Sequence, residues 1–237
     1  MRIFLSTSDK HLWALRPCLH LMEKYWPAHP PLVIAGYTRP ELSLPAPHNW
    51  YSIGAFADYP VERWSDGIIQ ALKDMPDELI LWWMEDFWLL RNVDTEAVEL
   101  VAQYMTQHRD VARVDLSSDR LYAGNVREVG ALGWLDLITN NLPVPYLLSF
   151  QAGIWRRSEL LRYLIPGETP WQTEINGTAR MNEAGARVLG TRQWPTRYLI
   201  AIQHGKVTLD GGYQVPPAAL RAEDWQELEA LDYLEPL

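Results

Sequence analysis

Two adjacent carboxylates, Glu85 and Asp86, interrupt the apolar run LILWWMEDFWLL at Leu79–Leu90. Because side chains alternate across a strand, one of the pair would face the interior unless the strand ends there and both open into a cleft. Buried carboxylates are costly unless they are paired or metal-bound, and hard divalent cations take oxygen ligands. The pair therefore indicates a cation site at the carboxyl end of a buried strand. A strand end with two solvated acids fits the same residues.

The segments around this run predict the elements that hold it. Short apolar runs predict strands at Arg2–Thr7, Leu32–Gly36, Leu79–Met84 and Ala112–Leu116. Apolar residues at helical spacing predict helices from Ser8-Asp9 to about Tyr25, over Val61–Asp74 and over Thr95–His108. Strands and helices that alternate in this way are typical of α/β proteins with a mostly parallel sheet and helices on its faces.

The second half of the chain has a less regular pattern. From Arg120 to about Pro145 the glycines and the pair Asn140-Asn141 indicate turns and short antiparallel pieces. The rest predicts a strand at Tyr146–Ile154, helices at Arg157–Leu164 and Trp171–Ala184, a last strand at Tyr198–Gln203 and an acidic amphipathic tail at Ala218–Leu237. We find no internal repeat, so we expect one domain over residues 1–237.

Composition narrows the class of protein. A chain of 237 residues with 48% hydrophobic and 22% charged residues is expected to fold around its own core. The net charge of -9 repels polyanions, which argues against non-specific nucleic-acid binding, although Arg156, Arg157 and Arg162 leave a local basic stripe open. A single cysteine, Cys18, and a start without an export signal favour the cytoplasm. No apolar run approaches the roughly 20 residues that cross a bilayer, so we expect no transmembrane segment.

An ordered set of segments resembles the bacterial glycosyltransferases of the GT-A fold, over most of the chain. The set is the strand-helix-strand opening, Trp64-Ser65-Asp66, Glu85-Asp86-Phe87, FQAGIWR at Phe150–Arg156, and Trp171-Gln172-Thr173-Glu174. The resemblance implies a GT-A-like α/β fold with a smaller, mixed or antiparallel C-terminal part. It also implies a nucleotide-binding half at residues 1–116 and an acceptor-side half at residues 117–237.

The resemblance also implies roles for single residues. The family's Asp-x-Asp motif holds Mn²⁺ or Mg²⁺ against the donor diphosphate; here Glu85 and Asp86 take its place, and position 88 is Trp88. Asp86 is the better candidate for the carboxylate that faces the metal and acts in catalysis, and His204 is a candidate third ligand. Glu174 would be the general base. Contacts to the nucleotide base and ribose are implied for Ser6, Thr7, Asp9, Trp64, Ser65 and Asp66.

Each of these roles has a structural alternative. Helix capping by Ser8 or Asp9 explains the residue types after the first strand equally well. Glu174 near a helix N-terminus is favourably placed on the helix dipole without any catalytic function. A lone histidine such as His204 is often structural or exposed, and Trp64 fits a core.

These expectations lead to a hypothesis about function. A bound cation would neutralise the departing diphosphate while a carboxylate deprotonates the acceptor, so we expect sugar transfer from a nucleotide-sugar donor to a glycan or another hydroxyl acceptor. Polysaccharide or cell-envelope glycan synthesis is the expected setting. Alternatives are a non-catalytic carbohydrate- or nucleotide-binding protein of the same fold, and transfer to a modified nucleic-acid base. A nucleotidyltransferase is disfavoured because Ser6–Asp9 is not a glycine- and arginine-rich phosphate loop.

Overall fold

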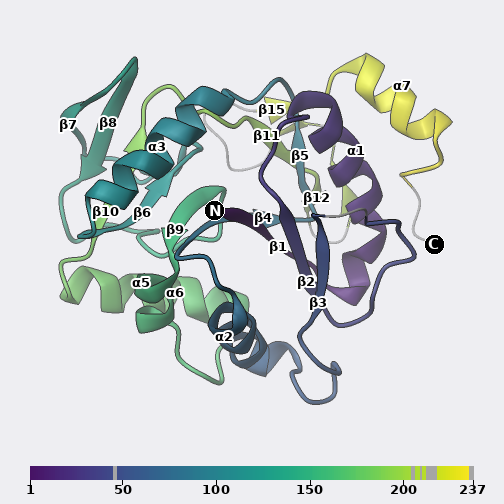
Figure 1. The fold of residues 1–237 in the computed structure, drawn as a ribbon, viewed down its shortest axis with the longest axis horizontal. Helices are drawn as coiled ribbons and strands as arrows, with labels where there is room; N and C mark the ends of the chain where they lie inside the picture. Colours follow the sequence, from purple (N-terminus) through teal and green to yellow (C-terminus); the bar gives the residue numbers. More distant parts are fainter. Residues whose placement is uncertain (45–46, 204–205, 209, 212–217, 235–237) are drawn as a thin grey trace.

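A central sheet runs through the protein. The computed structural model describes residues 1–44, 47–203, 206–208, 210–211 and 218–234. Within these residues nine strands form one sheet in the order β3-β2-β1-β4-β9-β6-β10-β8-β7 (Figure 1). In that order the strands are Asn49–Ser52, Leu32–Gly36, Arg2–Ser6, Leu79–Met84, Gly153–Arg156, Val111–Asp115, Arg187–Thr191, Leu135–Asn140 and Val126–Leu132.

The sheet changes direction at β9. Strands β3, β2, β1 and β4 are parallel to one another, and β6 is parallel to β10. Strand β9 pairs antiparallel with both β4 and β6. A strand from later in the chain therefore lies between β4 and β6, which correspond to two predicted strands that follow each other in the sequence. Strands β8 and β7 extend the sheet as an antiparallel hairpin beside β10. The predicted sheet with a mixed C-terminal part is confirmed.

Helices cover both faces of the sheet (Figure 1). One core contains buried residues of α1 (Leu15–Tyr25), α3 (Thr95–Gln107) and α7 (Ala222–Ala230). The other contains buried residues of α2 (Trp64–Asp74), α5 (Arg157–Tyr163) and α6 (Pro170–Glu183). The side chains of β4 alternate between the two cores. Leu81 and Trp83 belong to the first core, and Ile80 and Trp82 belong to the second.

Shorter elements complete the described part of the chain. They are η1 (Asp9–Ala14), η2 (Val61–Arg63), α4 (Asp119–Tyr122), β5 (Phe87–Leu89), β11 (Tyr198–Ile200), β12 (Ile202–Gln203), β13 (Lys206–Val207), β14 (Asp210–Gly211) and β15 (Ala218–Ala219). Strand β11 pairs with β5, so the segment after β10 returns to the end of β4. None of the helices in the described ranges has the length and apolarity that a bilayer crossing requires.

Several predicted elements differ from the structure. The strand predicted at Tyr146–Ile154 is wrong up to residue 152, because Tyr146 has a φ of 56° and side chains of α6 hold this segment as a loop. Strands β3 and β10 were not predicted. The first predicted helix divides into η1 and α1, and His11 has non-helical backbone angles. Ser8 makes no side-chain capping hydrogen bond.

Candidate active site

Glu85 and Asp86 form the turn between β4 and β5. The turn is fixed through its backbone, because the N–H of Ala201 donates to the carbonyl of Asp86 (2.8 Å) and the Trp88 indole donates to the carbonyl of Glu85 (3.2 Å). Glu85 is only 3% exposed, so the alternative of two solvated acids fails for it. Burial raises the pKa of Asp86 well above its usual range, and the neighbouring Glu85 adds to this shift.

Unsatisfied polar atoms gather around this turn. Among the buried atoms without a hydrogen-bond partner in the described part of the chain, four belong to this turn or to the residues after β1: Glu85 Oε2, Asp86 Oδ1, Thr7 Oγ1 and His11 Nε2. The pairing of Ser6 with Met84 brings the residues after β1 beside the residues after β4, and His11 Nδ1 lies 3.6 Å from Glu85 Oε1. Buried polar groups are normally paired, so these atoms are available to a ligand.

The residues at this turn fit a hard divalent cation. Two carboxylates with unpartnered oxygens are the donors that Mg²⁺ or Mn²⁺ takes. Burial first, and then the charge of Glu85, raises the pKa of Asp86. His204 lies outside the described residues. Sequence reasoning missed His11, whose one signal was its position shortly after the first strand.

Glu174 lies in the second turn of α6. This helix begins at a capping box. The Thr169 side chain accepts from the N–H of Gln172, and the Gln172 side chain accepts from the N–H of Thr169. Glu174 Oε1 accepts from the backbone N–H of Phe150 (2.7 Å). Burial raises the pKa of Glu174 to about 7 against the lowering effect of that bond, and nearby Asp119 raises it further. The bond to Phe150 gives Glu174 a structural role, and its role as a general base stays a prediction.

Strand β9 brings Glu174 to the edge of the sheet that carries Asp86, which is the side formed by the carboxyl end of β4. Because β9 runs antiparallel to β4, with Gly153 opposite Trp82, residues 150–152 lie beside the carboxyl end of β4. Phe150 is the residue whose N–H binds Glu174. The two acidic groups that sequence reasoning assigned to different halves of the chain therefore lie at one edge of the sheet.

A buried charge cluster supports this edge from β6. Arg113, which is fully buried, donates from Nη2 to the carbonyl of Gln151 (3.0 Å) and pairs with Asp115 (2.8 Å) and Asp119 (3.3 Å). Arg120 completes the cluster through Asp115 (2.6 Å). Buried ion pairs fix geometry more than they stabilise, so the cluster positions the 150–152 loop. No local pattern in the sequence indicated this cluster.

The candidate nucleotide contacts of the N-terminal segment lie at the carboxyl end of β1. Ser6 and Thr7 are buried there, and the N–H of Thr7 donates to the carbonyl of Ala35 (2.9 Å). The Asp9 carboxylate accepts from both the N–H and the hydroxyl of Thr38 (2.9 Å each). Asp9 therefore ties η1 to the loop after β2, and its role toward a nucleotide stays a prediction.

Trp64, Ser65 and Asp66 lie at the start of α2. The Trp64 ring packs on Phe150 with ring centroids 5.0 Å apart, as the core alternative predicted. Ser65 Oγ accepts from the N–H of Glu168 (2.9 Å), and Asp66 accepts from the N–H of Gly167 (2.7 Å). Both residues tie α2 to the segment before α6, so they position that helix, while nucleotide contacts by these three residues stay a prediction.

A comparison with solved structures identifies the fold of this chain. The crystal structure of S. aureus TarS residues 1–349 matches 98% of this chain with a TM-score of 0.51 and 14% sequence identity. This chain has a GT-A-like fold. It covers 64% of that TarS structure, less than two thirds of its length. At this identity the GT-A-like fold is what the likeness establishes.

Other solved structures are more distant from this GT-A-like chain. TarS 1–349 in complex with UDP has a TM-score of 0.49 and 13% identity over 80% of this chain and 57% of that one. The galactosyltransferase LgtC in complex with donor and acceptor sugar analogs has a TM-score of 0.43 and 14% identity over 79% and 73%. No protein-family model matches the chain, and no curated protein matches its sequence.

Proposed function

We propose that this chain is a glycosyltransferase that moves a sugar from a nucleotide-diphosphate donor to a hydroxyl group of a glycan or another acceptor. Residues 1–116 would supply the donor side and residues 117–237 the acceptor side. The cytoplasm and the synthesis of a polysaccharide or a cell-envelope glycan are the proposed setting. One observation supports the proposal most: two acidic groups, Asp86 and Glu174, lie at one sheet edge in different environments.

Asp86 and Glu85 are proposed to hold Mn²⁺ or Mg²⁺ on the donor side. The bound cation would neutralise negative charge on the departing diphosphate. Glu23, His29 and His48 are the group of potential ligands within 4.8 Å of one another in the described residues, and Asp86 is not among them. Such cations are commonly held by one or two carboxylates, substrate phosphates and water, which fits a pair of carboxylates without a third close ligand.

Glu174 is proposed to take the proton from the acceptor hydroxyl. A general base works best when its pKa lies near the working pH, and burial raises the pKa of Glu174 to about 7. The Phe150 N–H fixes Oε1 and so orients the carboxylate. An acceptor that reaches the edge beside residues 150–152 would meet this base.

A modified nucleic-acid base is a weaker candidate acceptor. The stripe of Arg156, Arg157 and Arg162 is not a free cationic surface: Arg156 is buried and donates to the carbonyls of Val111 (3.2 Å) and His108 (3.2 Å). Arg157 donates to the carbonyls of neighbouring residues, and Arg162 pairs with Glu159. Arg156 and Arg157 therefore do not form a free basic stripe that would offset the net charge of -9.

Thermal unfolding with Mn²⁺ and UDP, GDP, CMP or TDP tests the donor class, because binding to the folded state raises the midpoint by mass action. A rise that depends on both Mn²⁺ and one nucleotide supports the proposal. Release of that nucleotide from its sugar conjugates, with Glu174→Gln inactive, then separates catalysis from binding. Nucleotide-selective binding with no turnover on any conjugate would support the binding protein instead.

A further inference from the structure

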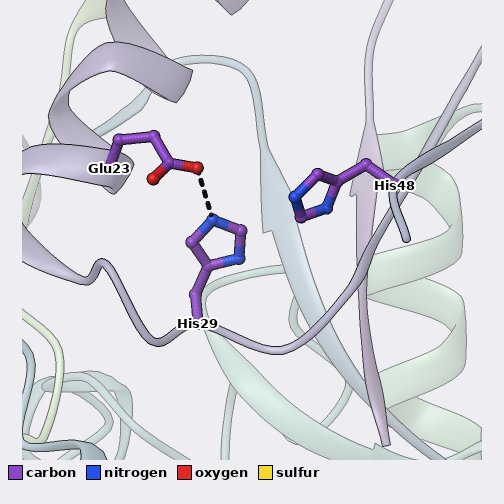
Figure 2. Close-up of side chains that lie close together, drawn as sticks. All are labelled: Glu23, His29 and His48. Atoms are coloured by element: carbon purple, nitrogen blue, oxygen red, sulfur yellow. Dashed lines mark hydrogen bonds and ion pairs between the residues drawn. The ribbon is translucent and has the colours of Figure 1, made fainter. Parts of the chain in front are cut away.

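A second group of potential metal ligands lies away from the Asp86 edge. Glu23 belongs to α1, His29 to the connection between α1 and β2, and His48 to the residue before β3. Their side chains approach one another in Figure 2, and one ligand atom from each lies within 4.8 Å of the others. Two imidazoles and a carboxylate are typical zinc ligands. We propose that Glu23, His29 and His48 bind Zn²⁺.

The tautomer of His29 carries the argument. His29 Nδ1 lies 2.8 Å from the carbonyl oxygen of Pro30, which only accepts, so Nδ1 holds a proton. In the neutral ring Nε2 then carries a lone pair, and it faces Glu23 Oε1 at 3.1 Å. Two acceptors at this distance repel each other unless a proton or a metal ion lies between them. An Nδ1–H bonded to a backbone carbonyl is also the usual outer contact of a zinc-bound histidine.

The distance between Glu23 and His29 suits a tetrahedral ion. With zinc bonds of about 2.0–2.1 Å, ligand atoms lie about 3.3 Å apart across a tetrahedron. The 3.1 Å between Glu23 Oε1 and His29 Nε2 is close to this value. Figure 2 shows a ring nitrogen of His48 directed toward the other two side chains, and the two imidazole centroids are 5.2 Å apart. His48 would move closer to the other two side chains to complete three protein ligands, with water at the fourth position.

His48 must change its hydrogen bond when zinc binds. In the structure its Nδ1 accepts from the N–H of Leu32 (3.1 Å), so the neutral ring carries its proton on Nε2. Ligation through Nε2 requires the other tautomer, with the proton on Nδ1, and the Leu32 amide then loses its acceptor.

The environment fits a partly enclosed site. The His29 side chain is 3% exposed and meets the ring of Trp26, whereas Glu23 is 62% exposed and leaves the ion open to water on one side. The bound ion would join α1 to the start of β3, the edge strand of the sheet. Zinc is therefore expected to stabilise this edge.

Calorimetric titration with ZnCl₂ tests the site on untagged full-length protein treated with a chelator. The protein carries Asp86→Asn, so that the acidic turn after β4 contributes less. One zinc per chain is expected, with a higher unfolding midpoint and a shifted Leu32 amide resonance. Affinity should fall at least 100-fold in His29→Ala and in His48→Gln, whose side-chain oxygen can still accept from Leu32.

The matched control is His20→Ala. His20 Nε2 also pairs with a carboxylate, Glu227, at 2.9 Å, and it is not part of the three-ligand group. Circular dichroism of each variant separates lost binding from lost fold. The proposal is overturned if zinc binds no more tightly to the parent protein than to folded His48→Gln, or if His20→Ala weakens binding as much as His29→Ala does.

Discussion

The ring of Tyr198 stacks on the ring of Phe87, with centroids 4.4 Å apart and an angle of 23° between the planes. Phe87 follows the acidic turn directly, while the Tyr198 hydroxyl donates to Gln151 Oε1 (2.6 Å) and accepts from the N–H of Ala152 (3.2 Å). One buried side chain thus contacts both the turn that carries Asp86 and the loop next to Glu174. We therefore expect the relative position of the two acidic groups to depend on this contact.

Tyr198→Phe tests that dependence. The substitution keeps the stacked ring but removes both hydrogen bonds, and leaves the N–H of Ala152 without its acceptor. We expect a loss of about 1–3 kcal/mol in the free energy of unfolding, measured by urea titration. We also expect a lower kcat for sugar transfer. Tyr51→Phe, which removes an exposed hydroxyl bonded to Asp74, is the control and should change activity little. Unchanged kcat in Tyr198→Phe would mean that the contact is only structural.

Glu174→Gln tests the proposed general base. The amide keeps an oxygen that can accept from Phe150 but cannot take a proton from the acceptor. We expect kcat to fall by about 10²–10⁴, with nucleotide affinity preserved. Glu183→Gln, at the other end of α6, is a matched control on an exposed side chain. A variant with wild-type kcat would remove Glu174 from the mechanism.

The raised pKa of Glu174 predicts opposite pH dependences for rate and stability. The base must be ionised, so kcat should rise with pH up to about 7 and then level off. The unfolded chain releases this proton near its ordinary pKa of 4.5, whereas the folded chain keeps it to about 7. The stabilisation from this proton is full below pH 4.5 and is lost as the pH rises through 7. Relative to wild type, Glu174→Gln should therefore be more stable at pH 8 than at pH 4, as measured by thermal unfolding.

Asp86→Asn should abolish the stabilisation by ligands without destabilising the free protein. The substitution removes a carboxylate that is poorly compensated next to Glu85, so the free protein should be at least as stable as wild type. The rise in midpoint with Mn²⁺ and nucleotide should disappear; a ligand at 100 times its Kd stabilises by about 2.7 kcal/mol. The exposed Glu99→Gln is the control. A rise that persists in Asp86→Asn would place the cation elsewhere.

His11→Ala tests the histidine that sequence reasoning missed. Its Nε2 is buried without a hydrogen-bond partner in the described residues, so no intramolecular bond is lost at that atom. We expect weaker Mn²⁺ and nucleotide binding, by about tenfold, because one contact of about 1.4 kcal/mol corresponds to that factor. Thermal shift and calorimetry measure the change beside His108→Ala. Equal binding in both variants would contradict a ligand role for His11.

Gly177→Ala should destabilise the protein although glycine lies inside a helix. Alanine normally gains about 1 kcal/mol at such a position. Here a Cβ would stand 2.4 Å from Leu148 Cδ1 and 3.3 Å from Leu148 Cβ. We expect a net loss of about 1–2 kcal/mol in urea unfolding, because Leu148 must shift. In a Leu148→Ala background the clash is removed, so Gly177→Ala should cost less stability there than in the wild-type protein. If Gly177→Ala alone is stabilising, the packing argument is wrong.

Local patterns in the sequence determined most strands and helices of the first half, although not β3. The apolar runs at Leu32–Gly36 and Leu79–Met84 coincide with β2 and β4, because a strand buried on both faces is apolar at every position. The same local pattern marked Glu85 and Asp86 as the end of β4. It failed at Tyr146–Ile154, where apolar residues line a loop, since their environment is made by α6, which follows later in the chain.

Only the tertiary structure decided which residues share a site. The insertion of β9 between β4 and β6 brings Phe150, and with it Glu174, to the edge that carries Asp86. Likewise, β1 pairs with β4 across more than 70 residues of sequence, which places Thr7 and His11 beside Glu85. Residue types and helical or strand periodicity are local properties, so the sequence by itself determined the acidic candidates and most elements. Strand order, and with it the burial that sets each pKa, depends on contacts between distant segments that no local pattern encodes.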